Sequence, residues 1–215
     1  PGSVVESSLE VRMAQALEAA SDPSINPENV VPEATREALP TRIGLVAGHY
    51  GNDSGSVCDN GVTEMEMNLK IETMVQKKLT DLGYTVDLLQ EFDDRMDGYR
   101  GRVLVSIHLD SCAYVNDLAT GYKVETALSN QNLAAGQKLI ACLSDQYGAI
   151  TGLPYHAGSV TDDMTYYHAF SEIDPITPAA IIEAGFLSMD YQFITEKTEI
   201  IADGIVAGIL CFLAD

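Results

Sequence analysis

The most constraining feature of the sequence is an alternation of short apolar runs with helical segments that begins at Arg42. Residues 43–48 form an uninterrupted apolar run, which is typical of a strand buried on both faces. Further strands are expected over residues 85–89, 103–107 and 179–182, and helices over 64–82, 130–147 and 195–213. Because strands and helices alternate, we predict a single α/β domain over residues 42–215, with a mainly parallel twisted sheet and helices on both faces.

The helix expected over residues 64–82 has the clearest local signals. Its apolar residues recur at a spacing of three to four, which gives one buried stripe, and the stripe ends before Gly83. Thr63 and Glu66 have the spacing of a capping box, in which each side chain bonds the backbone of the other. The start of this helix is therefore fixed near Glu64.

Residues 1–41 differ from the rest of the chain. Residues 4–20 carry a weak helical pattern, and residues 21–40 contain four prolines among polar residues. We predict an N-terminal extension with a Pro-rich linker, in which residues 1–3 resemble the scar of a cleaved tag. The segment would either tie the domain to an anchor or carry a helix that docks on the domain and regulates access.

Charge narrows the classes of partner. The chain has 32 acidic and 12 basic residues and a formal net charge of -20 at pH 7, which would repel the phosphates of a nucleic acid. No apolar run reaches the roughly 18 residues that span a bilayer. We therefore expect no nucleic acid partner, and membrane contact only through an anchor or signal that has been removed. The sequence carries no signal for the oligomeric state.

Ionisable residues follow three of the predicted strands. His49, His108 and Glu183 come at strand ends, and Glu64 opens the capped helix, where the helix dipole favours a carboxylate. The carboxyl ends of parallel strands meet at one edge of a sheet, so these four side chains are expected to converge there. Two imidazoles and one carboxylate form a catalytic zinc site with a free position for water. Zinc would lower the pKa of that water to about 7, and a nearby carboxylate such as Glu183 would move protons during amide hydrolysis.

The same residues carry a family resemblance. His49 lies in GHYGND, Glu64 in GVTEMEMNL, His108 in SIHLDS and Glu183 in IIEAGFLS. In order and spacing these motifs resemble the amidase-3 family of N-acetylmuramoyl-L-alanine amidases, over residues 42–215. The resemblance implies a phosphorylase/hydrolase-like fold and one zinc ion held by His49, Glu64 and His108, with Glu183 as the catalytic base. It also implies a peptidoglycan substrate and an exported protein of the bacterial cell envelope or extracellular space.

The sequence departs from the family pattern in three places. The family usually has Asn two residues after the second His, whereas this chain has Asp110. Only residues 90–102 separate the second and third strands, so we expect a trimmed sheet edge. Residues 152–178 are the one stretch long enough to hold the autoinhibitory helix of some members, and we expect a loop that lines the cleft instead. His156 and His168 lie in this stretch, as structural residues or as substrate contacts.

Two other functions are alternatives to the hydrolysis of peptidoglycan. The alternatives are a catalytically silent or autoinhibited peptidoglycan-binding module of the same fold, and a zinc carboxypeptidase, which would need an Arg near the metal.

Cys58 and Cys112 follow the two zinc-ligand histidines, so they would form a disulfide or remain two thiols. Cys142 and Cys211 lie among apolar residues of predicted helices, and we expect small buried side chains there rather than a second bridge.

Overall fold

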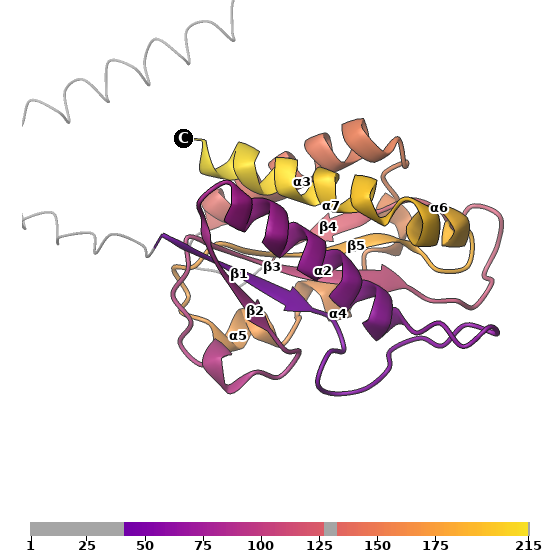
Figure 1. Ribbon diagram of the computed structural model, residues 1–215, viewed down its shortest axis with the longest axis horizontal. Helices are drawn as coiled ribbons and strands as arrows, with labels where there is room; N and C mark the ends of the chain where they lie inside the picture. Colours follow the sequence, from indigo (N-terminus) through magenta and orange to yellow (C-terminus); the bar gives the residue numbers. More distant parts are fainter. Residues whose placement is uncertain (1–40, 127–132, 215) are drawn as a thin grey trace, which may run out of the picture. The chain divides into compact units, whose positions relative to one another are not determined.

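A computed structural model describes residues 41–126 and 133–214; the predicted extension over residues 1–41 lies outside them except for Thr41. The described chain forms a five-stranded sheet in the order β2-β1-β3-β5-β4 (Figure 1). The strands are β1 (Arg42–Ala47), β2 (Thr85–Leu89), β3 (Val103–Asp110), β4 (Lys123–Glu125) and β5 (Ala179–Phe186). All neighbours are parallel except β4, which runs antiparallel to β5. The predicted α/β fold with a mainly parallel sheet is confirmed.

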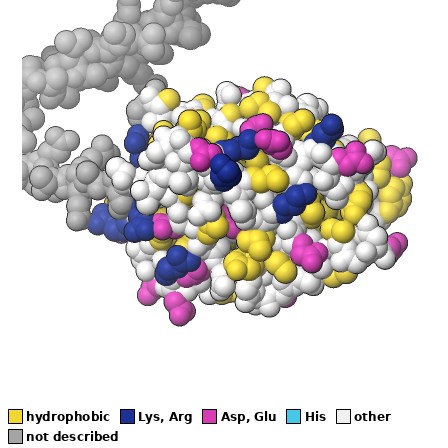
Figure 2. All heavy atoms as spheres, in the orientation of Figure 1, with side chains coloured by type: hydrophobic (Ala, Val, Ile, Leu, Met, Phe, Trp, Pro, Cys, Tyr) yellow, Lys and Arg dark blue, Asp and Glu magenta, His cyan; other side chains and the backbone are white. Residues whose placement is uncertain are grey.

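Helices cover both faces of the sheet, but unequally. The three long helices pack on one face (Figure 1): α2 (Glu64–Asp81), α3 (Leu133–Thr151) and α7 (Thr198–Leu213). The other face is covered by the short helices α4 (Asp162–Thr165) and α5 (Ala169–Glu172), which pack with Met96 and Tyr99. On the face shown in Figure 2, acidic, basic and apolar side chains are interspersed, without a continuous patch of one charge. No described helix is long and apolar enough to cross a membrane.

Helix α2 begins as its sequence predicts. The hydroxyl of Thr63 accepts from the Glu66 backbone N–H at 3.2 Å, and the Glu66 carboxylate accepts from the Thr63 backbone N–H at 3.2 Å. Met67, Ile71 and Val75 are buried against the sheet. This reciprocal cap fixes the first turn of α2, and with it the position of Glu64.

Short elements differ from the sequence prediction. Strand β4 has three residues, too few for a periodic pattern. The predicted helix over 195–213 is divided into α6 (Tyr191–Glu196) and α7, which meet at Lys197. Between β2 and β3 the chain forms only a 3-10 turn over Asp94–Met96, which agrees with a trimmed edge. Residues 152–178 contain α4, α5 and a 3-10 turn over Ala157–Ser159 instead of one long helix.

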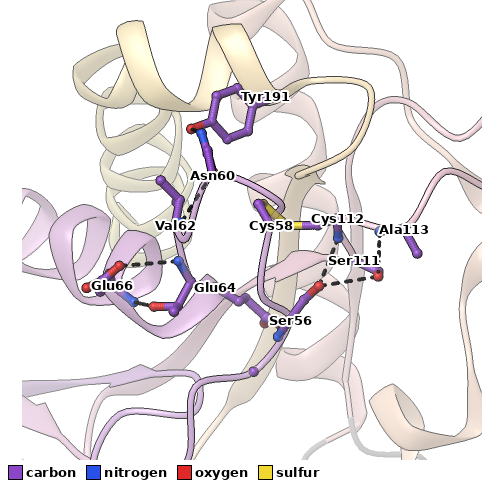
Figure 3. Close-up of a disulfide and its surroundings, with 12 residues drawn as sticks. Ser56, Cys58, Asn60, Val62, Glu64, Glu66, Ser111, Cys112, Ala113 and Tyr191 are labelled. Atoms are coloured by element: carbon purple, nitrogen blue, oxygen red, sulfur yellow. Dashed lines mark hydrogen bonds between the residues drawn. A yellow bond between two sulfur atoms is a disulfide. The ribbon is translucent and has the colours of Figure 1, made fainter.

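Both pairs of cysteines form disulfides. Of the two alternatives for Cys58 and Cys112, the structure has the disulfide, with the two Cα atoms 5.2 Å apart (Figure 3). The expectation that Cys142 and Cys211 are unbridged was wrong, because they form a second disulfide with Cα atoms 5.6 Å apart. Helices α3 and α7 lie side by side on the same face of the sheet, which brings the two cysteines within bridging distance. Their apolar sequence neighbours indicated burial but not which helices would be adjacent.

Candidate active site

The four residues singled out from the sequence come from separate elements that meet at the carboxyl edge of the sheet. His49 follows β1, His108 lies near the end of β3, and Glu64 is the first residue of α2. Glu183 lies on β5 directly opposite His108 in the strand register. The predicted convergence of these side chains is therefore present in the structure.

His49, Glu64 and His108 form a compact cluster whose potential ligand atoms all lie within 4.8 Å of one another. Nε2 of His49 lies 3.1 Å from Oε1 of Glu64, and Nδ1 of His108 lies 3.5 Å from the same oxygen. The amide of Asn68 donates to Glu64 at 3.3 Å, which orients the carboxylate toward the two rings. Two imidazoles and one carboxylate around one point suit a divalent metal ion.

The nitrogen of each imidazole that faces away from Glu64 faces another carboxylate. Nδ1 of His49 is hydrogen-bonded to Oδ1 of Asp53 at 2.7 Å. Nε2 of His108 has no hydrogen-bond partner among the described residues and lies 3.6 Å from Oε2 of Glu91. Histidines that bind metal usually donate their second ring N–H to such an acceptor, which fixes the tautomer and the ring orientation. The donor set and its surroundings therefore fit a metal ion.

Electrostatic interactions within the cluster keep Glu64 ionised. Burial opposes ionisation, but hydrogen bonds from His108 and His49 hold the pKa of Glu64 well below its usual range. The hydrogen bond to Glu64 likewise raises the pKa of His49 to about 9, against the effect of its partial burial. The negative charge required of a ligand to a cation is thus present.

Two glycines allow the backbone to approach the cluster closely. A Cβ atom on Gly48 would overlap the ring of His108, and one on Gly55 would lie 2.7 Å from both Oε2 of Glu64 and Cδ2 of His49. Gly55 also has a φ of 57°, in the left-handed region that favours glycine. The loop after β1 therefore packs directly against the side chains of the cluster.

Substitution Gly48→Ala is expected to displace the His108 ring and to weaken metal binding by at least about tenfold, since small displacements of a ligand disturb its coordination. Competition with a chelator would measure the affinity. Gly61→Ala is the control, because its Cβ would meet nothing within 4 Å, although its φ of 86° makes that change costly to the backbone. Equal metal affinity in wild type and Gly48→Ala would contradict the assigned packing.

Glu183 is a partly buried carboxylate beside the cluster. Its Oε2 atom is sealed from solvent and has no hydrogen-bond partner among the described residues. Burial raises the pKa of Glu183 to about 7; Asp110 and Glu64 add to the rise, whereas His108 and Lys123 oppose it. A carboxyl group with a pKa near 7 can both accept and donate a proton at neutral pH.

The structure accounts for the acid at position 110. Oδ2 of Asp110 lies 2.7 Å from Nζ of Lys123, which is 2% exposed and also donates to Ser159 at 3.0 Å. Lys123 stands opposite Glu183 in the antiparallel register of β4 and β5. The negative charge that replaces the neutral amide of the family pattern is therefore balanced by a buried lysine.

His156 and His168 lie outside the cluster of His49, Glu64 and His108. His156 bonds Ser159 at 2.7 Å and packs against Phe186, while His168 bonds Glu91 and Glu172, both at 2.8 Å. The segment over residues 152–178 thus contacts Glu91, beside the cluster, through His168.

Sequence reasoning missed three residues beside the cluster: Asp53, Glu91 and Lys123. Asp53 stands four residues after His49, within the same motif, and Glu91 is an acid two residues beyond the end of β2 at the same sheet edge. These positions were a usable signal. No sequence signal pointed to Lys123, because it lies on the short strand β4, which the sequence does not predict.

A cluster of two histidines and a glutamate, with a second glutamate of raised pKa beside it, at the carboxyl edge of a parallel sheet, defines a metal-dependent hydrolase. The family model of N-acetylmuramoyl-L-alanine amidases, Amidase_3, matches residues 43–211. The chain belongs to this family of peptidoglycan amidases. No match was found among curated protein sequences.

Solved amidase structures share the fold. The CwlD amidase of Clostridioides difficile, in complex with the GerS lipoprotein, has a TM-score of 0.62 and 20% identity, over 81% of this chain and 99% of that one. Ami1 of Mycobacterium smegmatis has a TM-score of 0.62 and 19% identity, over 82% and 98%. The catalytic domain of CwlV from Bacillus (Paenibacillus) polymyxa has a TM-score of 0.57 and 21% identity, over 81% and 99%.

Proposed function

We propose that residues 42–215 form a zinc-dependent amidase domain that cleaves the bond between N-acetylmuramic acid and the L-alanine of the peptidoglycan stem peptide. One zinc ion would be held by His49, Glu64 and His108. The observation that carries this proposal is the convergence of their three ligand atoms within 4.8 Å, beside a carboxylate that stands outside the ligand set.

The chain's own residues supply the proton transfers. Bound zinc polarises an amide carbonyl and lowers the pKa of water to about 7. Glu183, opposite His108 on the adjacent strand, would accept the proton of the attacking water and pass it to the departing nitrogen of L-alanine. Its partly buried carboxyl, with a pKa of about 7, suits both steps.

A pocket of about 570 Å³ adjoins the ligand cluster and would receive the part of the substrate that flanks the scissile amide. Ser56 joins the two sites, because it lines the pocket and its backbone N–H donates to Glu64 at 3.2 Å (Figure 3). The pocket is lined by hydroxyl, amide and tyrosine groups, including those of Asn60, Tyr114, Ser188 and Tyr191. Such groups suit the hydroxyls and the apolar faces of a sugar ring.

The disulfides support an exported protein. Disulfides persist in oxidising compartments and are rare in the reducing cytosol. The Cys58–Cys112 bridge lies at the wall of the pocket and links the loops that follow β1 and β3. We therefore place the domain in the cell envelope or outside the cell, where peptidoglycan is found.

The proposal is tested by measuring metal content and the release of stem peptides from purified peptidoglycan. We expect one zinc per chain and new L-alanine amino termini, both abolished in His108→Ala. Zinc without cleavage would indicate a binding module, and release of single residues from peptide carboxyl termini would indicate a carboxypeptidase. Either result would overturn the proposed reaction.

A further inference from the structure

Glu91 lies behind the metal cluster and takes no part in the proposed reaction. It follows β2, and its side chain is 7% exposed. Its backbone N–H donates to the carbonyl of Tyr50 at 2.8 Å, which joins the loop after β2 to the loop that carries His49. A buried carboxylate is costly unless it is fully paired, so its contacts indicate what it does.

The first contact of Glu91 is with the backbone of His49. The His49 N–H donates to Oε2 of Glu91 at 2.6 Å. His49 has a φ of 69°, and it is the one residue other than glycine in the left-handed region within the described chain. This conformation is unfavourable for a residue that carries a Cβ atom, and it persists only where its surroundings impose it. The hydrogen bond from His49 to Glu91 thus stabilises the turn that directs the His49 ring toward Glu64.

The second contact is with the ring of His108. Oε2 of Glu91 lies 3.6 Å from Nε2 of His108, whereas Nδ1 of that ring faces Glu64. A carboxylate beside Nε2 favours the tautomer that carries its proton there, and this leaves the Nδ1 lone pair free for a metal. Glu91 therefore lies against both histidines of the cluster, at the backbone N–H of His49 and at the ring of His108.

The second carboxylate oxygen of Glu91, Oε1, contacts residues 152–178, which contain the short helices α4 and α5. Oε1 lies 2.8 Å from Nε2 of His168, whose Nδ1 lies 2.8 Å from Glu172. The ring of His168 stacks on Phe92 with centroids 4.1 Å apart. Glu91 thus connects the ligand histidines to residues 152–178 through one carboxylate.

We propose that Glu91 is a positioning residue of the metal centre, which holds the left-handed turn at His49 and directs Nδ1 of His108 to the metal. This inference relies on the proposed ligand set, but it does not depend on which amide bond is cleaved. The pairing with His168 fixes the Glu91 carboxylate for both contacts.

The first test is the zinc affinity of Glu91→Gln and Glu91→Ala, measured by competition with a chromophoric chelator. Loss of a carboxylate behind a ligand typically weakens metal binding about 10–100-fold. We expect at least a tenfold loss for Glu91→Gln and a larger one for Glu91→Ala. Asp94→Asn is the matched control, since it removes the same charge from an exposed position in the same loop. His168→Ala, which spares both ligand contacts, should weaken zinc binding less than Glu91→Gln.

The second test separates positioning from general destabilisation. Nitrogen-15 spectra of the histidine rings should show His108 with its proton on Nε2 in the wild type, and a mixture of tautomers in Glu91→Gln. Affinity and tautomer that both match the wild type in Glu91→Gln would overturn the inference, even if peptidoglycan cleavage were established. Conversely, zinc binding that depends on Glu91 in a chain without cleavage would uphold it and refute the proposed function.

Discussion

Glu183→Gln is expected to lower the rate of stem-peptide release by about 10²–10⁴-fold while zinc remains bound, because this is the usual contribution of a positioned acid or base. The substitution keeps the size of the side chain and removes its ability to accept a proton. Glu183 lies outside the three-residue ligand group, so the metal should stay in place. The measurements are the rate of appearance of L-alanine amino termini and the zinc content of the same preparation.

Glu125→Gln is the matched control for that experiment. Glu125 lies on β4, opposite Ile181 of β5, and its carboxylate bonds the backbone N–H of Thr126 at 2.9 Å, away from the ligand cluster. Its activity should equal that of the wild type. Loss of zinc from Glu183→Gln would make Glu183 a ligand, and activity within about tenfold of the wild type would remove it from proton transfer.

Glu72→Gln is expected to stabilise the protein at alkaline pH. Glu72 on α2 is 0% exposed, and neither of its carboxylate oxygens has a hydrogen-bond partner among the described residues. Burial raises the pKa of Glu72 to about 8, and the backbone of Leu89 opposes that rise only in part. The folded chain therefore keeps a proton here that the unfolded chain releases near pH 4.5, the ordinary value for a glutamate.

The sign of the effect follows from this difference in bound protons. Because the folded state binds more protons between about pH 4.5 and pH 8, the contribution of Glu72 to the unfolding free energy falls as pH rises through that window. Each pKa unit corresponds to about 1.4 kcal/mol, so the loss between about pH 5 and pH 9 is on the order of 3–5 kcal/mol. Glu72→Gln removes the titrating group and should retain most of that free energy.

Denaturant unfolding of wild type and Glu72→Gln at several pH values would measure this gain. The difference in unfolding free energy between the two proteins should grow from about pH 5 to pH 8 and then level off. Asp81→Asn, a change at an exposed acid on the same helix, should give a difference that varies little with pH. A difference in unfolding free energy that stays constant with pH would show that folding does not raise the pKa of Glu72.

Much of the fold and of the candidate site was predictable because the signals are local and periodic. The apolar run before His49 and the reciprocal cap around Glu64 each fix one element, and parallel topology then places the strand ends together. The four candidate residues converge for that reason. Their contact needed no knowledge of distances, only the rule that the carboxyl ends of parallel strands share one edge.

The features that were missed depend on pairings across long sequence separations. Cys142 and Cys211 lie 69 residues apart, and only the side-by-side packing of α3 and α7 reveals their bridge. The position of Glu91 after β2 indicated the correct sheet edge, but its hydrogen bond from the backbone of His49, 42 residues earlier, is visible only in the structure. Lys123 lies on a strand of three residues, which carries no periodic pattern of its own.

The two disulfides divide the residues of the candidate site between two separate covalent rings. The ring closed by Cys58 and Cys112 contains Glu64 and His108, whereas the ring closed by Cys142 and Cys211 contains Glu183. A single proteolytic cut inside either ring leaves one covalent molecule until a reductant is added. A cut between Cys112 and Cys142 instead gives two pieces without a covalent link, one that bears the three proposed metal ligands and one that bears Glu183, the proposed proton carrier.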